Sequence, residues 1–132
     1  MPKQILIVDD DEDSLFILSA ILTKAGYGVS TAKDGQEALR ILCRSRPDLV
    51  LLDLILPEMD GFSVSETIKS SASLRAIPVL MISAWTDADS VLEKQSLRAG
   101  AEELLTKPID PKTLLSKVKK YLKKNLLPLS PG

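Results

Sequence analysis

The sequence ILIVDDDED, residues 5–13, joins four large aliphatic residues directly to a cluster of acids. Further short apolar runs lie at residues 49–52 and 79–82, with weaker ones at 29–32 and 103–105. Uninterrupted apolar runs of about four residues are typical of strands buried on both faces of a sheet. The pattern therefore predicts five short strands.

Between these runs, apolar residues recur at three- and four-residue spacing, which indicates amphipathic helices. The expected helices cover residues 13–25, 35–45, 61–70, 87–98 and 111–124. Strands that alternate with helices form parallel sheets with right-handed crossovers. The predicted fold class is therefore α/β, a (βα)5 three-layer sandwich around a five-stranded parallel sheet.

The length of 132 residues favours one domain, which we expect over residues 1–125, with a short tail or the start of a linker at 126–132. The 17 basic and 18 acidic residues nearly balance, which favours no direct contact with nucleic acid. No apolar run approaches the length of a membrane span. These features indicate one soluble domain without membrane insertion.

The cysteine and histidine content limits the chemistry. A single cysteine, Cys43, excludes an internal disulfide and fits a reducing cytoplasm; its neighbours Leu39 and Leu42 favour a place in the core. The chain has no histidine, so the usual general base and transition-metal ligand are missing. Its chemistry must use carboxylates, hydroxyls and amines, and any phosphohistidine must come from another molecule.

Reactive side chains stand at the carboxyl ends of four predicted strands. The first strand is followed by Asp9 and Asp10, the third by Asp53, the fourth by Ser83 and the fifth by Lys107. Parallel strands end at one edge of a sheet, where α/β proteins bind ligands. If the strand order is 2-1-3-4-5, Asp10 and Asp53 lie on neighbouring strands that flank the point at which that order reverses. We therefore expect these groups to meet.

Three neighbouring carboxylates repel one another, so a cation or an amine must offset them. Mg2+, or Mn2+ in its place, suits such an acidic pocket, and Lys107 would neutralise the remaining charge. Each residue alone has an ordinary explanation: Asp11 or Asp13 can cap a helix, Ser83 can form a turn, and Lys107 can be a surface charge. Their coincidence at four strand ends favours phosphoryl transfer.

These stretches resemble the receiver domains of response regulators in bacterial two-component systems. The matching segments are ILIVDDDED, residues 48–62 (DLVLLDLILPEMDGF), 79–84 (VLMISA) and 100–108 (GAEELLTKP), and the resemblance extends over residues 3–122. It implies a single-domain, chemotaxis-regulator-like protein with the flavodoxin-like strand order 2-1-3-4-5. It also implies a switch that catalyses its own phosphorylation and dephosphorylation.

The resemblance implies specific roles for the metal and phosphoryl ligands. Asp53 resembles the phosphoacceptor, Asp10 a direct metal ligand, and Asp9 a ligand acting through water. The backbone carbonyl of Ile55 resembles the third protein ligand of the metal. Lys107 resembles the amine that pairs with the phosphoryl oxygens.

The resemblance also implies a switch. Ser83 resembles the hydroxyl that turns toward the phosphoryl group, Ala84 follows it in the switch loop, and the peptide before Pro108 is expected to be cis. Leu104 departs from the family, which usually has Tyr or Phe there, and so alters the form of signal propagation. Trp85 lies near the pocket mouth, where it could exclude water or contact a partner.

The implied partners are a histidine kinase or histidine phosphotransfer protein as donor, and a downstream protein or output domain as target. The readout surface would comprise residues 87–98, 103–105 and 111–124, in a monomer or a phosphorylation-induced dimer. The last helix carries a basic stripe, Lys117, Lys119, Lys120, Lys123 and Lys124, which is most often a solvated face but leaves a partner-binding role open.

Three other interpretations compete with a receiver domain. A flavin protein of this fold needs a loop without the four acids after the first strand. A phosphatase of the haloacid-dehalogenase type usually has a second aspartate where Ile55 stands. The remaining alternative is a non-phosphorylated receiver-like interaction module; the complete set of acids, hydroxyl and lysine argues against it, and Leu104 argues mildly for it.

Overall fold

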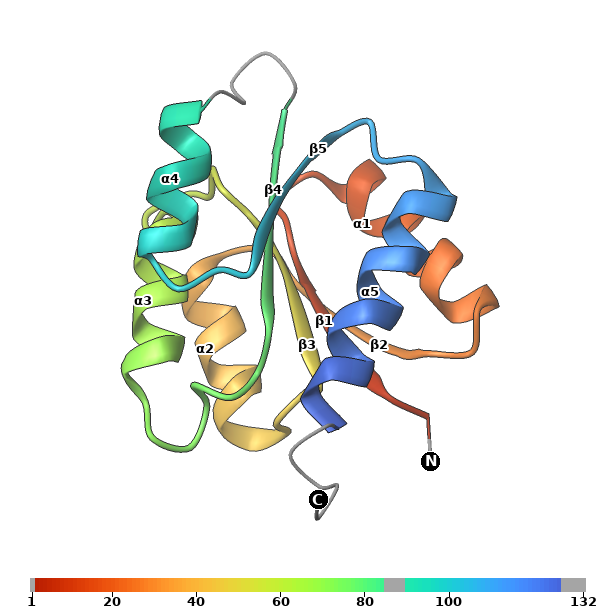
Figure 1. Cartoon of the computed structure of the whole chain (residues 1–132), viewed down its shortest axis with the longest axis horizontal. Helices are drawn as coiled ribbons and strands as arrows, with labels where there is room; N and C mark the ends of the chain where they lie inside the picture. The colour runs from red at the N-terminus through yellow and green to blue at the C-terminus, as the bar shows by residue number, and fades with distance from the viewer. Residues whose placement is uncertain (1, 85–89, 127–132) are drawn as a thin grey trace.

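A five-stranded parallel sheet forms the middle layer of the protein, seen here in a computed structural model that describes residues 2–84 and 90–126 (Figure 1). Its strand order is β2-β1-β3-β4-β5, which confirms the predicted order 2-1-3-4-5. All four neighbouring pairs are parallel. The strands are β1 (Gln4–Val8), β2 (Gly28–Ala32), β3 (Leu49–Asp53), β4 (Val79–Ala84) and β5 (Glu103–Lys107).

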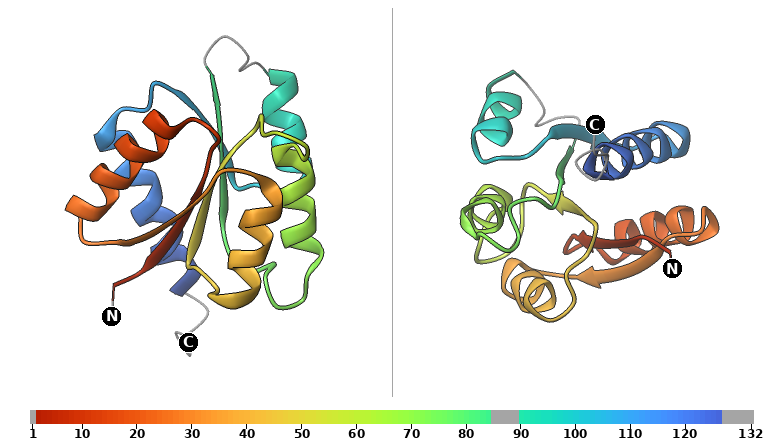
Figure 2. Two further views of the ribbon diagram at one scale, coloured as in Figure 1. Left: turned by 180° about the vertical axis from the view of Figure 1, so that it is seen from behind. Right: turned by 60° about the horizontal axis from the view of Figure 1, so that its bottom comes forward.

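Helices cover both faces of the sheet, as the end-on view in Figure 2 shows. One face carries α1 and α5, and the other carries α2, α3 and α4, so the predicted three-layer α/β sandwich is confirmed. No helix in the described part of the chain has the length and apolar character needed to cross a bilayer. The helices are α1 (Glu12–Lys24), α2 (Gly35–Arg44), α3 (Gly61–Ser70), α4 (Ser90–Arg98) and α5 (Pro111–Leu126).

The apolar runs are continuous because each central strand contributes to two cores. In β1, Leu6 and Val8 pack in the core beneath α2 and α3, while Ile5 and Ile7 pack in the core beneath α1 and α5. All four side chains are almost completely buried. A strand covered by helices on both faces has no solvent-facing position, which explains the absence of polar alternation.

Helix boundaries lie within three residues of the predictions. Helix α5 ends at Leu126 rather than at residue 124, so the first residue of the predicted tail, 126–132, belongs to this helix, and residues 127–132 lie outside the described residues. The expected start of α4 also falls partly on residues outside that range, and the observed helix begins at Ser90. The three- and four-residue spacing of apolar residues therefore located every helix.

Cys43 does not lie in the core, so that prediction was wrong. Helix α2 buries Ala38 and Leu42 against the sheet, whereas Cys43 is exposed. Successive residues of an α-helix are rotated by about 100° around its axis, so the residue after Leu42 turns away from the sheet. Apolar neighbours in the sequence therefore did not determine whether the Cys43 side chain is buried.

Helix α4 buries little apolar surface. Ser96 is its one buried residue in the described part of the chain, and the Ser96 Oγ has no hydrogen-bond partner among the described residues. By contrast, the buried Ser65 of α3 donates a 2.8 Å hydrogen bond from Oγ to the Ala99 carbonyl. An unpaired buried hydroxyl carries a desolvation penalty of about 1–3 kcal/mol.

We therefore expect Ser96→Ala to raise the free energy of unfolding by about 1 kcal/mol, since it removes an unpaired hydroxyl and introduces a stronger helix former. Urea denaturation of both proteins measures this difference. Ser65→Ala is the matched control and should lose about 1 kcal/mol, because its hydrogen bond disappears. A loss of stability in both variants would contradict the assignment of an unpaired Ser96 hydroxyl.

Candidate functional site

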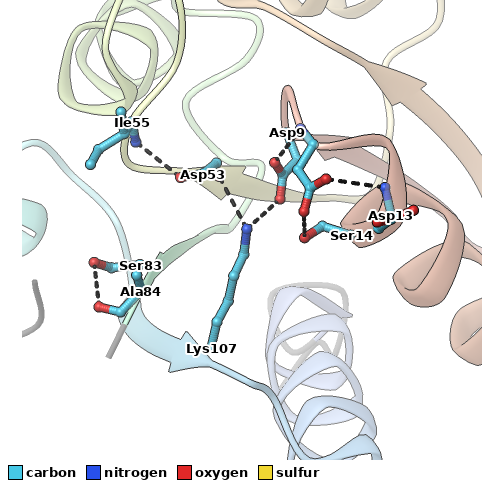
Figure 3. A network of polar contacts seen from close by, with 9 residues as sticks. Asp9, Asp13, Ser14, Asp53, Ile55, Ser83, Ala84 and Lys107 are labelled. Carbon is cyan, nitrogen blue, oxygen red and sulfur yellow. Dashed lines mark hydrogen bonds and ion pairs between the residues drawn. The ribbon is translucent and has the colours of Figure 1, made fainter. Parts of the chain in front are cut away.

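The carboxyl ends of the strands bring the predicted reactive residues together (Figure 3). One carboxylate oxygen from each of Asp9, Asp10 and Asp53 lies within 4.8 Å of the other two. Asp9 follows β1 directly, Asp53 is the last residue of β3, and the two strands are hydrogen-bonded neighbours. The expected cluster of three acids at the reversal of strand order is therefore present.

Lys107, the last residue of β5, reaches across β4 to this cluster. Its Nζ lies 2.7 Å from Asp9 Oδ2 and 3.3 Å from Asp53 Oδ2 (Figure 3). Burial lowers the pKa of Lys107, but the hydrogen bond to Asp9 and the charges of Asp53 and Asp9 outweigh it and raise the pKa overall. Lys107 is thus a cation held between two carboxylates, and the peptide joining it to Pro108 is cis, as predicted.

Asp53 is the most perturbed carboxyl of the site. Burial raises its pKa to about 6, and the charge of Asp9 acts in the same direction, while the Ile55 amide and Lys107 oppose the shift. The Ile55 amide donates a 3.0 Å hydrogen bond to Asp53 Oδ1. An ionised Asp53 is therefore disfavoured without a further positive charge near it.

Asp9 and Asp10 occupy different environments although they are adjacent. Asp9 is buried and accepts hydrogen bonds at both oxygens, from the Asp11 amide at Oδ1 and from Lys107 at Oδ2. Asp10 is exposed. Asp11 caps α1, accepting from the amide of Asp13 and the hydroxyl of Ser14, which confirms the capping interpretation.

The donor set fits a divalent metal ion. Three carboxylates gather within 4.8 Å, and Lys107 supplies one positive charge to offset three negative ones. Hard oxygen ligands in an excess of negative charge are what Mg2+ and Mn2+ prefer. The hollow above them measures about 180 Å³, and its lining consists of Asp9, Asp10, Asp11, Asp53, Ile55, Ser83, Ala84 and Lys107.

Ser83 lies beside the acids at the end of β4. Its side chain is buried, and its Oγ donates a 3.2 Å hydrogen bond to the Ala84 carbonyl. Figure 3 shows Ser83 and Ala84 across the site from Asp9, with Lys107 approaching Asp53 between them. The Ser83 hydroxyl thus lines the acidic hollow and is hydrogen-bonded to the backbone of the next residue.

The other predicted positions lie around this centre. Ile55 is 62% exposed at the rim, and Leu104 is half-buried against the core beneath α2, α3 and α4. Pro108 is exposed, and Trp85 lies outside the described residues. A second hollow of about 330 Å³ adjoins the acidic one; its lining is largely apolar and consists of Ser14, Ile17, Leu18, Ala84, Lys107, Pro108 and Ile109.

Gly61 is a site-supporting residue that the sequence reasoning used only as a helix boundary. The Gly61 amide donates a 2.9 Å hydrogen bond to the Leu54 carbonyl, which holds the start of α3 against the loop after Asp53. A Cβ at Gly61 would lie 2.5 Å from the Asp53 carbonyl oxygen. Its position directly after the helix cap Asp60 was the one available signal.

Comparisons with known proteins identify the family of this chain. The family described as "Response regulator receiver domain" matches residues 5–119. The chain is 43% identical to response regulator PleD of Caulobacter vibrioides over 119 residues, 90% of this chain and 26% of that protein. It is 37% identical to the alkaline phosphatase synthesis transcriptional regulatory protein PhoP of Bacillus subtilis, covering 95% of this chain and 50% of PhoP. The chain therefore spans a quarter to a half of these relatives.

Solved structures give the same result. Chemotaxis protein CheY4 of Vibrio cholerae superimposes with a TM-score of 0.86 at 30% identity, covering 92% of this chain and 99% of that one. The signal receiver domain of a signal transduction histidine kinase from Syntrophus aciditrophicus gives 0.85 at 36% identity, covering 92% and 91%. The chain belongs to the response regulator receiver domains, the family of two-component signalling whose fold and acidic edge it shares.

Proposed function

We propose that this chain is a phosphorylation-controlled signalling domain that accepts a phosphoryl group on the Asp53 carboxylate. The observation that carries the proposal is the convergence of Asp9, Asp10 and Asp53 within 4.8 Å, with Lys107 Nζ 2.7 and 3.3 Å from two of them. A cluster of this composition has little use in a purely structural role, because its net charge destabilises the folded state. The cluster suits the binding of a divalent cation together with a phosphoryl group.

The carboxylates of Asp9, Asp10 and Asp53 and the carbonyl of Ile55 would hold Mg2+ or Mn2+. A divalent ion there supplies neutralisation of the phosphoryl oxygens and of the acids. Asp9 already has two protein donors, whereas Asp10 is exposed. This difference favours Asp10 as the direct ligand and Asp9 as the one acting through water.

The transfer step is a nucleophilic substitution at phosphorus. An Asp53 carboxylate oxygen attacks the phosphorus of a phosphohistidine or a small acyl phosphate, forming a P–O bond as the P–N or P–O bond to the leaving group breaks. The leaving group departs with that electron pair, and a histidine leaving group takes a proton from solvent. Lys107 pairs with the phosphoryl oxygens, so its ammonium exchanges one anion for another without leaving the site.

The donor is proposed to be a histidine kinase or a histidine phosphotransfer protein. The apolar hollow bordering the site shares Ala84 and Lys107 with the acidic one, and Ile17 beside it is 56% exposed. An apolar surface contiguous with a reactive pocket favours a protein donor. Its docking there would bring a phosphorylated side chain directly over Asp53.

The response is proposed to pass through Ser83 and Leu104. The Ser83 hydroxyl, now donating to Ala84, would turn to the phosphoryl oxygens, and the loop after β4 would follow. Leu104 packs against the core on the α4 side, so a leucine replaces the aromatic part of the usual switch. The changed surface of α4, β5 and α5 would then regulate a downstream protein or an output domain.

The test is the intact mass of the protein after incubation with Mg2+ and a small acyl phosphate, followed by peptide mapping. We expect one phosphoryl adduct, located on the peptide that contains Asp53 and prevented by a chelator. A folded protein that gains no adduct from the acyl phosphate or from a panel of phosphorylated donors would overturn the proposal. That outcome would favour the constitutive interaction module.

We expect Asp10→Asn to weaken Mg2+ binding by about ten- to a hundredfold, since the site loses an anionic ligand. Titration calorimetry measures this change directly. Adduct formation should fall by the same factor at low Mg2+ and recover at high Mg2+. The matched control is Asp13→Asn, which removes an equal charge from the exposed first turn of α1 and should leave Mg2+ affinity nearly unchanged. Equal losses in the two variants would contradict a ligand role for Asp10.

The exposed Ile55 side chain at the rim favours a long-lived phosphoryl state, because a large apolar group limits the approach of water. We expect Ile55→Asn to accelerate loss of the adduct about tenfold, since an amide can orient the attacking water. Quenched samples analysed by intact mass give the rate. An unchanged rate of adduct loss would contradict the exclusion of water by Ile55. The variant Trp85→Ala tests the same hypothesis at the second predicted position.

A further inference from the structure

Helix α5 concentrates positive charge to a degree that the rest of the chain does not. It contains six of the 17 basic residues and none of the 18 acidic ones, which leaves 11 basic against 18 acidic residues elsewhere, a balance of −7. A chain that is almost neutral overall is therefore strongly polarised. One helix forms a cationic surface on an otherwise anionic domain.

Four of the six lysines of α5 lie on its exposed side. Lys112, Lys119 and Lys123 are spaced i, i+7 and i+11, so they lie within about 40° of one another around the helix, with Lys120 beside them. We call these four residues the lysine face; all four are exposed. Helix α5 runs from the edge that carries the candidate site toward the opposite edge (Figure 1). The stripe extends about 16 Å along this helix.

The ordinary explanations do not account for this face. Cations favour the last turn of a helix, yet Lys112 lies in the first turn, where the dipole disfavours it. Among the described side chains, Lys117 forms an ion pair with Glu103 at 2.6 Å, whereas no carboxylate pairs with Lys112, Lys119 or Lys123. Like charges at i, i+4, such as Lys119 and Lys123, destabilise a helix.

Helix α5 is nevertheless held against β5 by polar contacts on its buried side. Tyr121, on the buried face of α5, donates a 2.6 Å hydrogen bond from its hydroxyl to Glu103 Oε2. Glu103 is the first residue of β5, and Lys117 binds its other oxygen. Burial and the Glu103 carboxylate together raise the pKa of Tyr121 to about 12, so the phenol remains a donor over the physiological range.

We propose that the lysine face binds an acidic segment of a partner protein. The charge balance of −7 outside α5 disfavours a nucleic acid, because that polyanion would extend past the helix onto anionic surface. Apart from Pro111 at its start, the exposed residues in the described part of α5 are lysine, serine and threonine, so this face has no large, fully exposed apolar side chain to enter a membrane. A short acidic helix can pair with the lysine face without contacting the anionic surface of the rest of the domain.

The test uses the full chain and a fluorescent alanine-based helical peptide with glutamates at i, i+4, i+7 and i+11. Fluorescence anisotropy gives its affinity, and amide chemical shifts locate it. We expect shifts along α5, and binding that weakens about tenfold as NaCl rises from about 0.05 to about 0.3 M. The triple variant Lys112→Gln, Lys119→Gln, Lys123→Gln should weaken binding about tenfold or more.

The control variant Lys3→Gln, Lys24→Gln, Lys94→Gln removes the same charge outside α5 and should retain most of the affinity. Equal losses in the two triple variants, or shifts spread over the whole surface, would overturn the proposal. So would binding of single-stranded DNA, or of vesicles rich in phosphatidylserine, that exceeds binding of the peptide. Adduct formation at Asp53 should be unchanged in the lysine-face variant, which separates this proposal from the proposed function.

Discussion

Asp53→Asn is expected to eliminate the phosphoryl adduct that forms with Mg2+ and a small acyl phosphate. A carboxamide oxygen is a far weaker nucleophile than a carboxylate, and an adduct on it could not form the same mixed anhydride. We expect no adduct on the neighbouring Asp9, because it is more deeply buried than Asp53 and lies closer to Lys107, at 2.7 Å against 3.3 Å. Intact mass spectra of wild type and variant under identical conditions measure the effect.

The same substitution should stabilise the protein in the absence of metal, by about 1–3 kcal/mol at neutral pH. Burial raises the pKa of Asp53 to about 6, which means that its ionised form is disfavoured in the fold. An amide of the same shape removes that penalty and leaves Lys107 paired with Asp9 at 2.7 Å. Urea denaturation in a chelator measures the gain.

Mg2+ should reverse the order of stability. Ligand binding to the folded state stabilises wild type, whereas the variant lacks one of the three carboxylates that would hold the ion. We therefore expect Mg2+ to raise the unfolding temperature of wild type more than that of the variant. An Asp53→Asn protein that still gains the adduct would move the acceptor elsewhere, and one that is less stable without metal would contradict the electrostatic account.

Gly61→Ala is expected to lower the free energy of unfolding by about 3 kcal/mol or more. The new Cβ would lie 2.5 Å from the Asp53 carbonyl oxygen and 2.9 Å from the Leu54 Cα, and neither backbone atom can move without shifting the end of β3. The same shift would displace the Asp53 side chain, so Mg2+ affinity should fall as well. Urea denaturation and titration calorimetry measure the two effects.

Gly26→Ala provides a control for loss of a glycine. Gly26 has a φ of 98° and open space where a Cβ would stand, so its substitution costs only backbone strain, about 1–2 kcal/mol. It lies after α1, away from the acids, and should leave Mg2+ affinity unchanged. If the two alanine variants were equally destabilised and both bound Mg2+ normally, close packing at Gly61 would not be the reason for its presence.

The fold was predictable from the sequence because its central strands carry the signal. The uninterrupted apolar runs of β1, β3 and β4 can only belong to a sheet covered on both faces, and that requirement fixes the alternation with helices. The start of α1 was also predictable, because its cap at Asp11 is local. Strand order depended on recognising the family segments rather than on periodicity.

The site was predictable at the strand ends and less so elsewhere. Asp53 and Lys107 were expected at the carboxyl ends of two parallel strands, at the same edge of the sheet, and they form an ion pair there. The exposure of Cys43, and the lack of a partner for the Ser96 hydroxyl among the described residues, depend on side-chain direction in three dimensions. The close approach of Gly61 to Asp53 likewise exists only after β3 and α3 have packed, so no local pattern reports it.

The two glutamates at the start of β5 attach one end of that strand to both layers of helices. Glu102 accepts from the Val79 amide at 2.6 Å and pairs with Lys69 of α3 at 3.0 Å, while Glu103 binds Lys117 and Tyr121 of α5. At the other end, Lys107 is held by the carboxylates of the acidic hollow. Strand β5 is thus anchored by carboxylates at both ends, and a change of charge at Asp53 acts on the end that carries Lys107.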